Sequence, residues 1–377
     1  MKALVVGCGL SGAVVARTLA ERGWEVEIWD RRNHIGGNLY DYVDNHGIRV
    51  HKYGPHIFHT KNPAIHDFVC RFGEWRPYKL VCGAVLDGQY TPTAFNFTTI
   101  DKFYEPEKAQ ALKTRLLELF PGRKTVTVVE ALACSDPLVR GYAEFLFEKD
   151  YRPYTAKQWG LDPSKIDPSI LKRVPLRLSY DEAYFDDPYE MMPAEGYTAW
   201  FEKILKHNLI SVHLGVDALS RLKIGDDLSL TRDGFPVSEK VVYTGALDEL
   251  FGFRCGTLPY RSLRFEWVYE DVASKQPAPV VAYPQEPCYT RITEYKKLPV
   301  QDVRGTSLAY EYPLPISTEN EPYYPVLTEA SARIYSQYME LARRIRNLVP
   351  CGRLGCFKYF NMDQAIAAAL EAAESCA

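Results

Sequence analysis

The chain opens with a strand, a glycine-rich turn, a helix and a second strand, and this order restricts its fold more than any other feature. Lys2 to Val6 is a short apolar run typical of a buried parallel strand, and the sequence GCGLSG follows it directly. Helical spacing comes next, and a second apolar run ends at Asp30. This order is the dinucleotide-binding fingerprint, which predicts an α/β fold with a pyrophosphate at a helix N-terminus.

Each residue of the fingerprint has its own expected task. Gly7 permits the tight turn, Gly9 lets the backbone approach a pyrophosphate, and Gly12 lets helix and strand pack closely. Asp30 is placed to bind the ribose hydroxyls. The alternative is a glycine-rich turn that only connects the strand to the helix. The expected cofactor contacts in this segment are Gly7, Gly9, Ser11, Gly12, Asp30 and Arg31.

A second glycine cluster follows the acid at once, in the sequence RRNHIGGN from Arg31 to Asn38. Its paired glycines indicate a backbone pressed against a long, extended ligand. The order resembles FAD-binding proteins of the amine-oxidase and glutathione-reductase-like groups, so Gly37 and Asn38 join the expected cofactor contacts. No second GxGxxG occurs in the chain, and an FAD at the first site leaves no obvious nicotinamide site.

Composition narrows the class of protein. The 377 residues, 46% hydrophobic and 25% charged, suit a globular protein with two or three packed units. A net charge of −3 without a long basic run disfavours nucleic acid as a partner. No apolar stretch is long enough for a bilayer span, and the first core strand leaves no room for a signal peptide, so a cytoplasmic protein without stable membrane insertion is expected. The nine cysteines form no CxxC pair and have no zinc-ligand spacing with histidines, so free thiols and no metal site are expected.

Secondary-structure patterns predict interleaved domains. Helical spacing at 105–120 and 136–149 indicates an inserted helical domain at 98–180, which includes a mobile loop. Alternation of apolar and polar residues at 260–312 predicts an antiparallel sheet. The expected Rossmann-like FAD-binding domain is discontinuous, and the antiparallel β-sheet domain is expected to hold substrate. The FAD-binding domain comprises 1–75, 197–250 and 325–377, and the substrate domain comprises 76–97, 181–196 and 251–324.

The sequence also predicts the secondary structure of five shorter segments. Residues 240–245 form a late strand that returns to the nucleotide-binding sheet, and 196–208 form an amphipathic helix. Residues 348–355 are predicted as a strand and a turn. The alanine-rich helix at 362–375 could direct its N-terminus at the flavin. The proline-rich stretch 158–175 is the best candidate for the mobile loop.

Four segments are polar and aromatic where plain core elements would be expected. They are YGPHIFHT at 53–60, YTAKQWG at 154–160, LKRVPLR at 171–177 and PCYTRITE at 287–294. The two histidines of the first segment have a structural alternative, in which backbone carbonyls satisfy them. Together with GCGLSGAVVA, NHIGGN, YRSL, PYYP and GRLG, these segments make the chain similar, nearly end to end, to UDP-galactopyranose mutases of the bacterial type.

The resemblance implies covalent catalysis by reduced FAD. Its N5 atom attacks the anomeric carbon of galactose and expels UDP in this chemistry. The sugar opens on the flavin as an iminium, recloses through its 4-hydroxyl as a furanose, and UDP returns, with no net redox change. The resemblance further implies a nucleotide-sugar substrate, a homodimer, and a product used in cell-wall or polysaccharide biosynthesis.

The residues that the resemblance assigns to the substrate have suitable chemistry. A departing pyrophosphate concentrates negative charge, which guanidinium groups hold in a bidentate geometry. Arg173, in the loop expected to close over substrate, and Arg291 match the two phosphate arginines, with Arg261 as a supporting cation. A phenol offers a donor on a rigid apolar stem. The matched phosphate tyrosines are Tyr184, Tyr324 and Tyr359.

The remaining matched positions surround the sugar, the base and the flavin. Seen alone, an arginine is more often a solvated surface charge and a tyrosine more often packs between core and rim. The resemblance places Tyr154 and Trp159 in the nucleotide and sugar pocket and Tyr151 against the uracil. It places Asn361 among the substrate contacts. The residues that it places against the flavin are His56, His59, Arg353 and Met362. The expected catalytic residues are Arg173, Arg291 and His59.

The chain departs from the family pattern at four places. Asp150 and Tyr151 stand where two aromatic residues meet the uracil in the family, and Pro153 replaces a frequent glycine. Ala94 occupies the place of a usual proline, and Asn361 that of an acid. These differences leave the flavin chemistry intact but put the accepted base or sugar in doubt.

Three alternatives to UDP-galactopyranose mutase activity therefore stay open. The same N5 chemistry could act on UDP-N-acetylgalactosamine or on a dTDP-6-deoxysugar. An amine-oxidase-like flavin oxidoreductase would share the N-terminal motif, but it has no pyrophosphate for the arginines and tyrosines to hold. A nucleotide-sugar binder without catalysis is the third.

Overall fold

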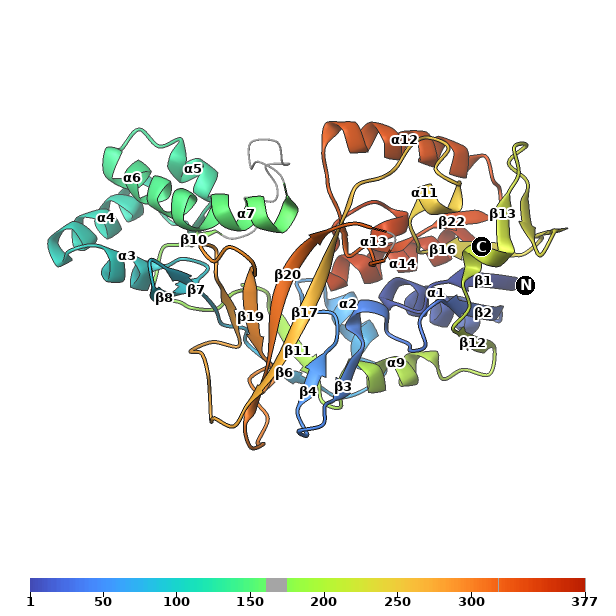
Figure 1. The fold of residues 1–377 in the computed structure, drawn as a ribbon, viewed down its shortest axis with the longest axis horizontal. Helices are drawn as coiled ribbons and strands as arrows, with labels where there is room; N and C mark the ends of the chain where they lie inside the picture. Colours follow the sequence, from blue (N-terminus) through green and yellow to red (C-terminus); the bar gives the residue numbers. More distant parts are fainter. Residues whose placement is uncertain (161–174, 318, 377) are drawn as a thin grey trace.

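A five-stranded parallel sheet carries the predicted fingerprint in the computed structural model, which describes residues 1–160, 175–317 and 319–376. The strand order is β12–β2–β1–β16–β22, and every pair is parallel. The sheet lies at the right of Figure 1, with both labelled chain ends beside it. It comprises β1 (Lys2–Val6), β2 (Glu25–Asp30), β12 (Ile210–Leu214), β16 (Lys240–Tyr243) and β22 (Leu348–Pro350).

The expected strand at 240–245 is confirmed as β16, which pairs with β1. The expected strand and turn at 348–355 are confirmed in part, because β22 is followed by a short helix, α13 (Gly352–Gly355). β12 was not among the predicted strands. The sheet thus unites strands from the beginning, the middle and the end of the chain, in keeping with a Rossmann-like fold.

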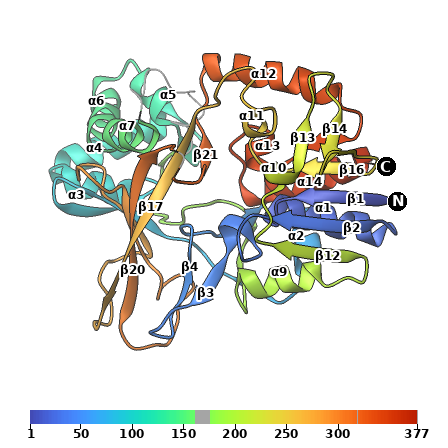
Figure 2. The same ribbon diagram turned by 45° about the vertical axis from the view of Figure 1, so that its right-hand side comes forward.

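Helices cover both faces of this sheet, as a buried parallel sheet requires. Within β1, Ala3 and Val5 enter one core and Leu4 enters the other. Burial of the Val5 and Leu4 side chains contributes about 1.5–3 kcal/mol each. In Figure 2, α12 lies above the sheet and α9 below it. One face is covered by α1 (Leu10–Glu21), α9 (Tyr197–Leu205) and α14 (Met362–Cys376), and the other by α11 (Leu247–Leu250) and α12 (Glu329–Arg343).

A seven-stranded sheet forms the middle of the molecule. Its order is β21–β17–β20–β19–β18–β7–β8, and the pairs are antiparallel except for β18 with β7. The long strands β17 and β20 run diagonally between the two halves in Figure 1. The predicted antiparallel sheet at 260–312 is thereby confirmed. The strands are β7 (Cys82–Leu86), β8 (Gln89–Thr93), β17 (Tyr260–Glu270), β18 (Val280–Ala282), β19 (Arg291–Glu294), β20 (Thr306–Pro315) and β21 (Tyr324–Pro325).

A group of helices with its own core packs at the far end of this sheet. Asn96 and Asp136 cap two of these helices with their side chains, which satisfies the first amide groups. The group comprises α3 (Phe97–Phe103), α4 (Pro106–Leu119), α5 (Val128–Leu132), α6 (Pro137–Leu146) and α7 (Arg152–Trp159). The predicted helices at 105–120 and 136–149 are confirmed as α4 and α6.

A π-helical turn, Phe147–Tyr151, joins α6 to α7. Pro153 stands at the start of α7 and has no amide hydrogen to continue the regular ladder. A local shift to wider hydrogen bonding is a common way for a helix to pass such a point. The turn carries Asp150 and Tyr151 at the entrance to α7, which is the helix of the YTAKQWG segment.

Candidate active site

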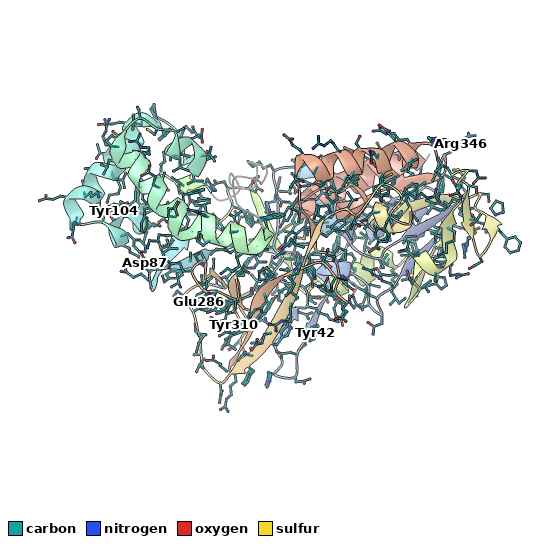
Figure 3. All side chains as sticks on the ribbon, turned by 45° about the horizontal axis from the view of Figure 1, so that its top comes forward. Tyr42, Asp87, Tyr104, Glu286, Tyr310 and Arg346 are labelled. Carbon is teal, nitrogen blue, oxygen red and sulfur yellow. The ribbon has the colours of Figure 1, made fainter. Side chains whose placement is uncertain are left out.

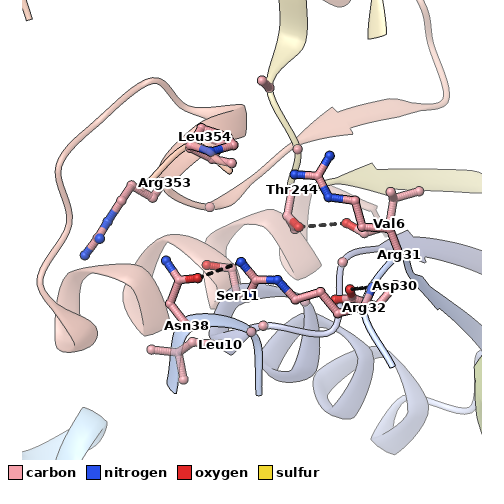
Figure 4. Close-up of a pocket in the computed structure, with 18 of the residues that line it drawn as sticks. Val6, Leu10, Ser11, Asp30, Arg31, Arg32, Asn38, Thr244, Arg353 and Leu354 are labelled. Atoms are coloured by element: carbon pink, nitrogen blue, oxygen red, sulfur yellow. Dashed lines mark hydrogen bonds between the residues drawn. The ribbon is translucent and has the colours of Figure 1, made fainter. Parts of the chain in front are cut away.

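A pocket lies at the carboxyl ends of the parallel strands, where open α/β sheets bind their ligands. Its walls come from the fingerprint turn, the second glycine cluster, the segment 216–219 after β12 and the segment 244–246 after β16. The N-terminal parts of α13 and α14 close it. Figure 4 shows Asp30, Asn38, Thr244 and Arg353 directed around this space.

The two glycine clusters touch each other in the wall of the pocket. The amide of Gly36 donates to the carbonyl of Cys8 at 2.9 Å. A Cβ atom on Gly37 would lie 2.8 Å from the Cα of Gly9, and one on Gly12 would lie 1.9 Å from the carbonyl oxygen of Gly7. Gly37 also has a φ of +55°, which favours glycine. Bare backbone therefore forms this wall, and a ligand can approach it closely.

The first helix presents unused amide groups to the pocket. Gly9 is the N-cap of α1, and it provides no side-chain cap. Ser11 and Gly12 of the first turn line the pocket. Because the first amides of a helix lack intrahelical partners and carry the positive end of its dipole, this terminus suits a pyrophosphate. Met362 and Ala365 of α14 line the same pocket, so the N-terminus of the alanine-rich helix also lies beside it.

Asp30 and its two arginine neighbours form the outer wall. The Asp30 carboxylate accepts hydrogen bonds from the amides of Cys8, at 2.7 Å, and Arg32, at 2.8 Å. Each carboxylate oxygen has a further lone pair for a ribose hydroxyl. The predicted contact Arg31 lies 3.9 Å from Glu249, and both line the pocket.

Arg32 is a pocket residue that the sequence analysis missed. Its guanidinium donates to Asn38 at 3.0 Å, pairs with Glu321, and lies 4.3 Å above the ring of Tyr53. Asn38 itself was a predicted cofactor contact and lines the pocket. Arg32 adjoins the predicted Arg31 in the RRNHIGGN cluster, so the repeated basic residue was the available signal.

His56 and Arg353 lie at the inner end of the pocket. The Nδ1 of His56 donates to the carbonyl of Gly54 at 2.8 Å, which leaves Nε2 as an acceptor. Burial, together with neighbouring His51 and Arg353, lowers the pKa of His56 to about 3. The imidazole is therefore neutral at ordinary pH. Arg353 donates to the carbonyl of Phe360 at 2.8 Å. Asn361 and Met362, two further predicted positions, also line this end.

His59 is not among the residues that line the pocket. It belongs to β5 (Phe58–Thr60), in a three-stranded sheet with β6 (Trp75–Pro77) and β11 (Tyr189–Pro193). Its Nδ1 is 2.5 Å from a carboxylate oxygen of Asp187, and its ring stacks on Phe185 with centroids 3.7 Å apart. The geometry thus separates the two histidines of the YGPHIFHT segment.

Arg291 stands next to this inner end of the pocket. On the neighbouring strand β20, Glu311 faces it in register and accepts from its Nε at 2.8 Å and its Nη2 at 2.7 Å. Burial by itself lowers the pKa of Arg291, but Glu311 and nearby Tyr154 and Tyr359 outweigh it and hold the pKa well above its usual value. Arg291 is also among the charges that act on His56. A permanently charged guanidinium with a fixed orientation therefore lies beside the pocket.

Three aromatic rings from separate segments meet at the same place. Trp159 of α7 contacts Tyr324 of β21 with centroids 5.0 Å apart, and Tyr359 lies 6.2 Å from Trp159. Arg353 lies 4.8 Å above the ring of Tyr359 and so joins these rings to the pocket. The side-chain amide of Gln158, which the sequence analysis missed, donates to the hydroxyl of Tyr324.

Arg261, the predicted supporting cation, lies at the C-terminal end of α7. Its Nε donates to the carbonyl of Gln158 at 3.0 Å and its Nη2 to that of Lys157 at 3.3 Å. Burial lowers its pKa, and Tyr324 opposes this shift. A cation at this position complements the negative end of the helix dipole.

The residues expected at the base are buried in the helical part of the molecule. Tyr151 is 4% exposed and lies 5.9 Å from Phe95, ring to ring. Asp150 is 8% exposed, and burial raises the pKa of its carboxyl to about 7, against the opposing charge of Lys157. Tyr184 contacts Phe185 edge to face at 4.9 Å. Arg173, the other predicted phosphate arginine, lies outside the described residues, as does most of the predicted loop at 158–175.

Within residues 1–160, 175–317 and 319–376, no group of three or more His, Cys, Asp or Glu side chains could hold a metal ion. None of the helices in these ranges is long and apolar enough to cross a membrane.

Comparison with known proteins points to one family. The family model for UDP-galactopyranose mutase matches residues 149–359, and a model for NAD(P)-binding Rossmann-like domains matches residues 5–72. A dTDP-fucopyranose mutase from Escherichia coli is 35% identical over 99% of this chain and 97% of its own length. A UDP-galactopyranose mutase from Mycoplasma pneumoniae is 35% identical over 98% of this chain and 95% of its own length. Among solved structures, reduced UDP-galactopyranose mutase superposes with a TM-score of 0.72 over 99% of this chain and 94% of that chain, at 15% identity, which shows a common fold.

Proposed function

Because the chain belongs to the UDP-galactopyranose mutase family, whose members are isomerases, we propose that it interconverts UDP-galactopyranose and UDP-galactofuranose with reduced FAD. The observation that carries this proposal is the fixed cation Arg291, which interacts with Tyr154 and Tyr359 and acts on His56 at the inner end of the pocket. Tyr324 lies 6.0 Å from Tyr359, ring to ring. An oxidase acting on an amine would have no use for this cation and its phenols.

The residues of the pocket fit FAD. The paired glycine wall, where a Cβ on Gly37 would overlap Gly9, accepts a ligand pressed along the backbone. The first turn of α1 would hold the pyrophosphate, and Asp30 would hold the ribose. When bound and reduced, FAD would supply the nucleophile, its N5 atom, for the covalent route that the resemblance implies.

The substrate side would hold the diphosphate of the nucleotide sugar. Arg291 is oriented by Glu311, so its remaining N–H groups can bind phosphate oxygens without losing that orientation. The hydroxyls of Tyr324 and Tyr359 add neutral donors next to it. Arg173 would add a second guanidinium from the segment outside the described residues. These groups would stabilise the charge that develops as the diphosphate leaves and returns.

His56 would contribute a neutral acceptor near the reacting part of the flavin. Its Nδ1 is committed to Gly54, and its low pKa keeps Nε2 unprotonated. An acceptor at this place can hold a hydroxyl or N–H group without adding charge to the site. His59, predicted as catalytic, would have to act from outside the described pocket lining.

A dTDP-6-deoxysugar is the second candidate substrate. One relative of comparable similarity is named as a dTDP-fucopyranose mutase. This chain also has the buried acid Asp150 where the family pattern has an aromatic residue at the base. Cytoplasmic location, a homodimer and supply of a surface polysaccharide stay predictions from the resemblance.

Product analysis with UDP-galactofuranose tests the proposal, with dithionite-reduced and oxidised enzyme compared. Formation of UDP-galactopyranose only by the reduced enzyme is the expected result. Conversion of dTDP-fucofuranose in preference to UDP-galactofuranose would transfer the assignment to the second candidate. Oxygen consumption with an amine, and no sugar conversion, would contradict both.

A further inference from the structure

Lys157 is held in an unusual environment at the end of α7. Its ammonium nitrogen lies 2.5 to 3.2 Å from four backbone carbonyl oxygens, those of Tyr283, Pro284, Glu286 and Tyr289. All four belong to the loop between β18 and β19. An ammonium group has three hydrogens, so these carbonyls satisfy every donor. In the described ranges Lys157 forms no ion pair with a carboxylate within 4.0 Å, and the loop carbonyls are the hydrogen-bond acceptors of its ammonium group.

The loop around Lys157 leads directly into Arg291. Its ends are joined by the amide of Tyr283, which donates to the carbonyl of Thr290 at 2.8 Å. The amide of Thr290 in turn donates to the carbonyl of Glu311, the partner of Arg291, at 2.9 Å. Figure 3 shows the labelled Glu286 of this loop next to α7. The ammonium group of Lys157 thus lies inside the closed loop 283–290, and Arg291 is the next residue of the chain.

A second contact runs in the opposite direction between the same elements. Arg261 of β17 donates to the carbonyls of Lys157 and Gln158, at the C-terminal end of α7. Lys157 of the helix therefore donates to carbonyls of the loop between β18 and β19. In return, Arg261 of the sheet donates to carbonyls of the helix. Tyr154, one helical turn before Lys157, lies on the same side of α7 and interacts with Arg291.

We propose that Lys157 is a positioning residue that joins α7 to the loop 283–290, so that Tyr154, Gln158 and Trp159 stand opposite Arg291 across the substrate site. This role rests on the proposed mutase function, because it concerns the geometry of the diphosphate site. Removing the ammonium takes a donor from all four carbonyls, and among the described residues only that of Tyr283 keeps another backbone donor, the amide of Glu286 at 3.3 Å, so the loop must rearrange to hydrate the others. Arg291 would then lose its fixed position relative to the aromatic residues of α7.

The charge of Lys157 also connects this contact to pH. Burial lowers its pKa to about 8, against the opposing charges of Glu286 and Cys288 on the loop and Asp150 on the helix segment. Loss of the proton removes one donor and the charge, so turnover should fall as pH rises through about 8. The unfolded state holds this proton more tightly, so this group makes the free energy of unfolding rise with pH between about 8 and 10.5. A loss of activity without a loss of stability is therefore expected there.

The test compares Lys157→Met, Lys157→Arg and the control Lys102→Met, each loaded with FAD. Lys102 on α3 also donates to a backbone carbonyl, that of Tyr90 at 2.6 Å, but in an exposed contact. We expect Lys157→Met to keep its FAD content and a cooperative melting transition, while kcat/KM falls about 10- to 100-fold, chiefly through KM. Lys157→Arg should recover part of this loss and move the alkaline limb to higher pH. Lys102→Met should match the wild type.

Hydrogen exchange of the loop 283–290 separates this proposal from the proposed function. Faster exchange of these amides in Lys157→Met supports the positioning role even in a protein that converts no UDP-galactofuranose. Wild-type exchange together with wild-type kcat/KM in Lys157→Met would overturn it. Loss of FAD and of the cooperative melting transition in Lys157→Met, with no recovery in Lys157→Arg, would also overturn it, because the lysine would then support the fold as a whole.

Discussion

The cofactor pocket and the substrate side of this molecule are built from different materials. Backbone forms much of the pocket wall, through glycines that touch each other and through helix N-termini. Asp30 is held beside this wall because its carboxylate accepts from two backbone amides. Long side chains form the substrate side, where Arg291, Trp159 and Tyr324 come from three distant segments. The pocket therefore depends on the absence of side chains, and the substrate side on their orientation. Variants at the two places should fail in different ways.

Gly37→Val should have the largest effect, because its side chain would overlap the glycine backbone that forms the pocket wall. The new Cβ would lie 2.8 Å from the Cα of Gly9, at a φ of +55° that costs a branched residue about 1–3 kcal/mol. We expect purified protein with only traces of flavin and no turnover. Absorbance of the bound flavin measures this directly. Full flavin content in this variant would contradict the assignment of the wall.

Arg291→Ala should keep the flavin and lose turnover. Removal of a preorganised charged donor costs about 10²–10³ in rate. The same variant leaves Glu311 buried without its partner, so its melting temperature has to be checked in parallel. Arg264→Ala on β17 is a matched control, because Arg264 is exposed and pairs only weakly with Glu266. Arg173→Ala is predicted to behave like Arg291→Ala, and wild-type-like kcat/KM in either variant would remove that arginine from the site.

Acid should weaken the fold through the buried His51 and the partly buried His56. Burial lowers the pKa values of both His51 and His56 to about 3. The unfolded chain binds these protons near pH 6.5, so the free energy of unfolding falls as pH drops from about 6.5 toward 3. Urea unfolding at pH 7 and pH 4.5 should show the difference. In His51→Gln the fall should be shallower, and an equal fall would contradict this origin.

His59→Asn should have the smallest effect, and it tests whether His59 belongs to the active site. Because His59 is half-buried against Asp187 and Phe185 and does not line the pocket, we expect kcat/KM to change less than about threefold. Steady-state kinetics with the reduced enzyme measures it. A 100-fold or greater loss of kcat/KM with normal flavin content would show that His59 is catalytic.

The same contrast explains what could be read from the sequence. The turn at Gly7 to Gly12 and the acid at Asp30 are local, and their spacing alone indicated the pocket. Arg291 and Tyr324 meet only after β19 and β21 have joined one sheet, so they entered the prediction through family resemblance. Lys157 belongs to the YTAKQWG segment of that resemblance, but its contacts could not be predicted, because its partners are backbone carbonyls, which every sequence contains. The position of His59 depends on strand pairing with β11, which the local pattern did not reveal.

The parallel sheet has a consequence for synthesis of the protein. Its first strand pairs with β16, which follows about 240 residues later, and α1 packs against α14. A growing chain on the ribosome therefore carries the glycine turns long before the helices that complete the pocket. The pocket is therefore complete only once α14 has been synthesised, and until then the side of α1 that packs against α14 stays uncovered.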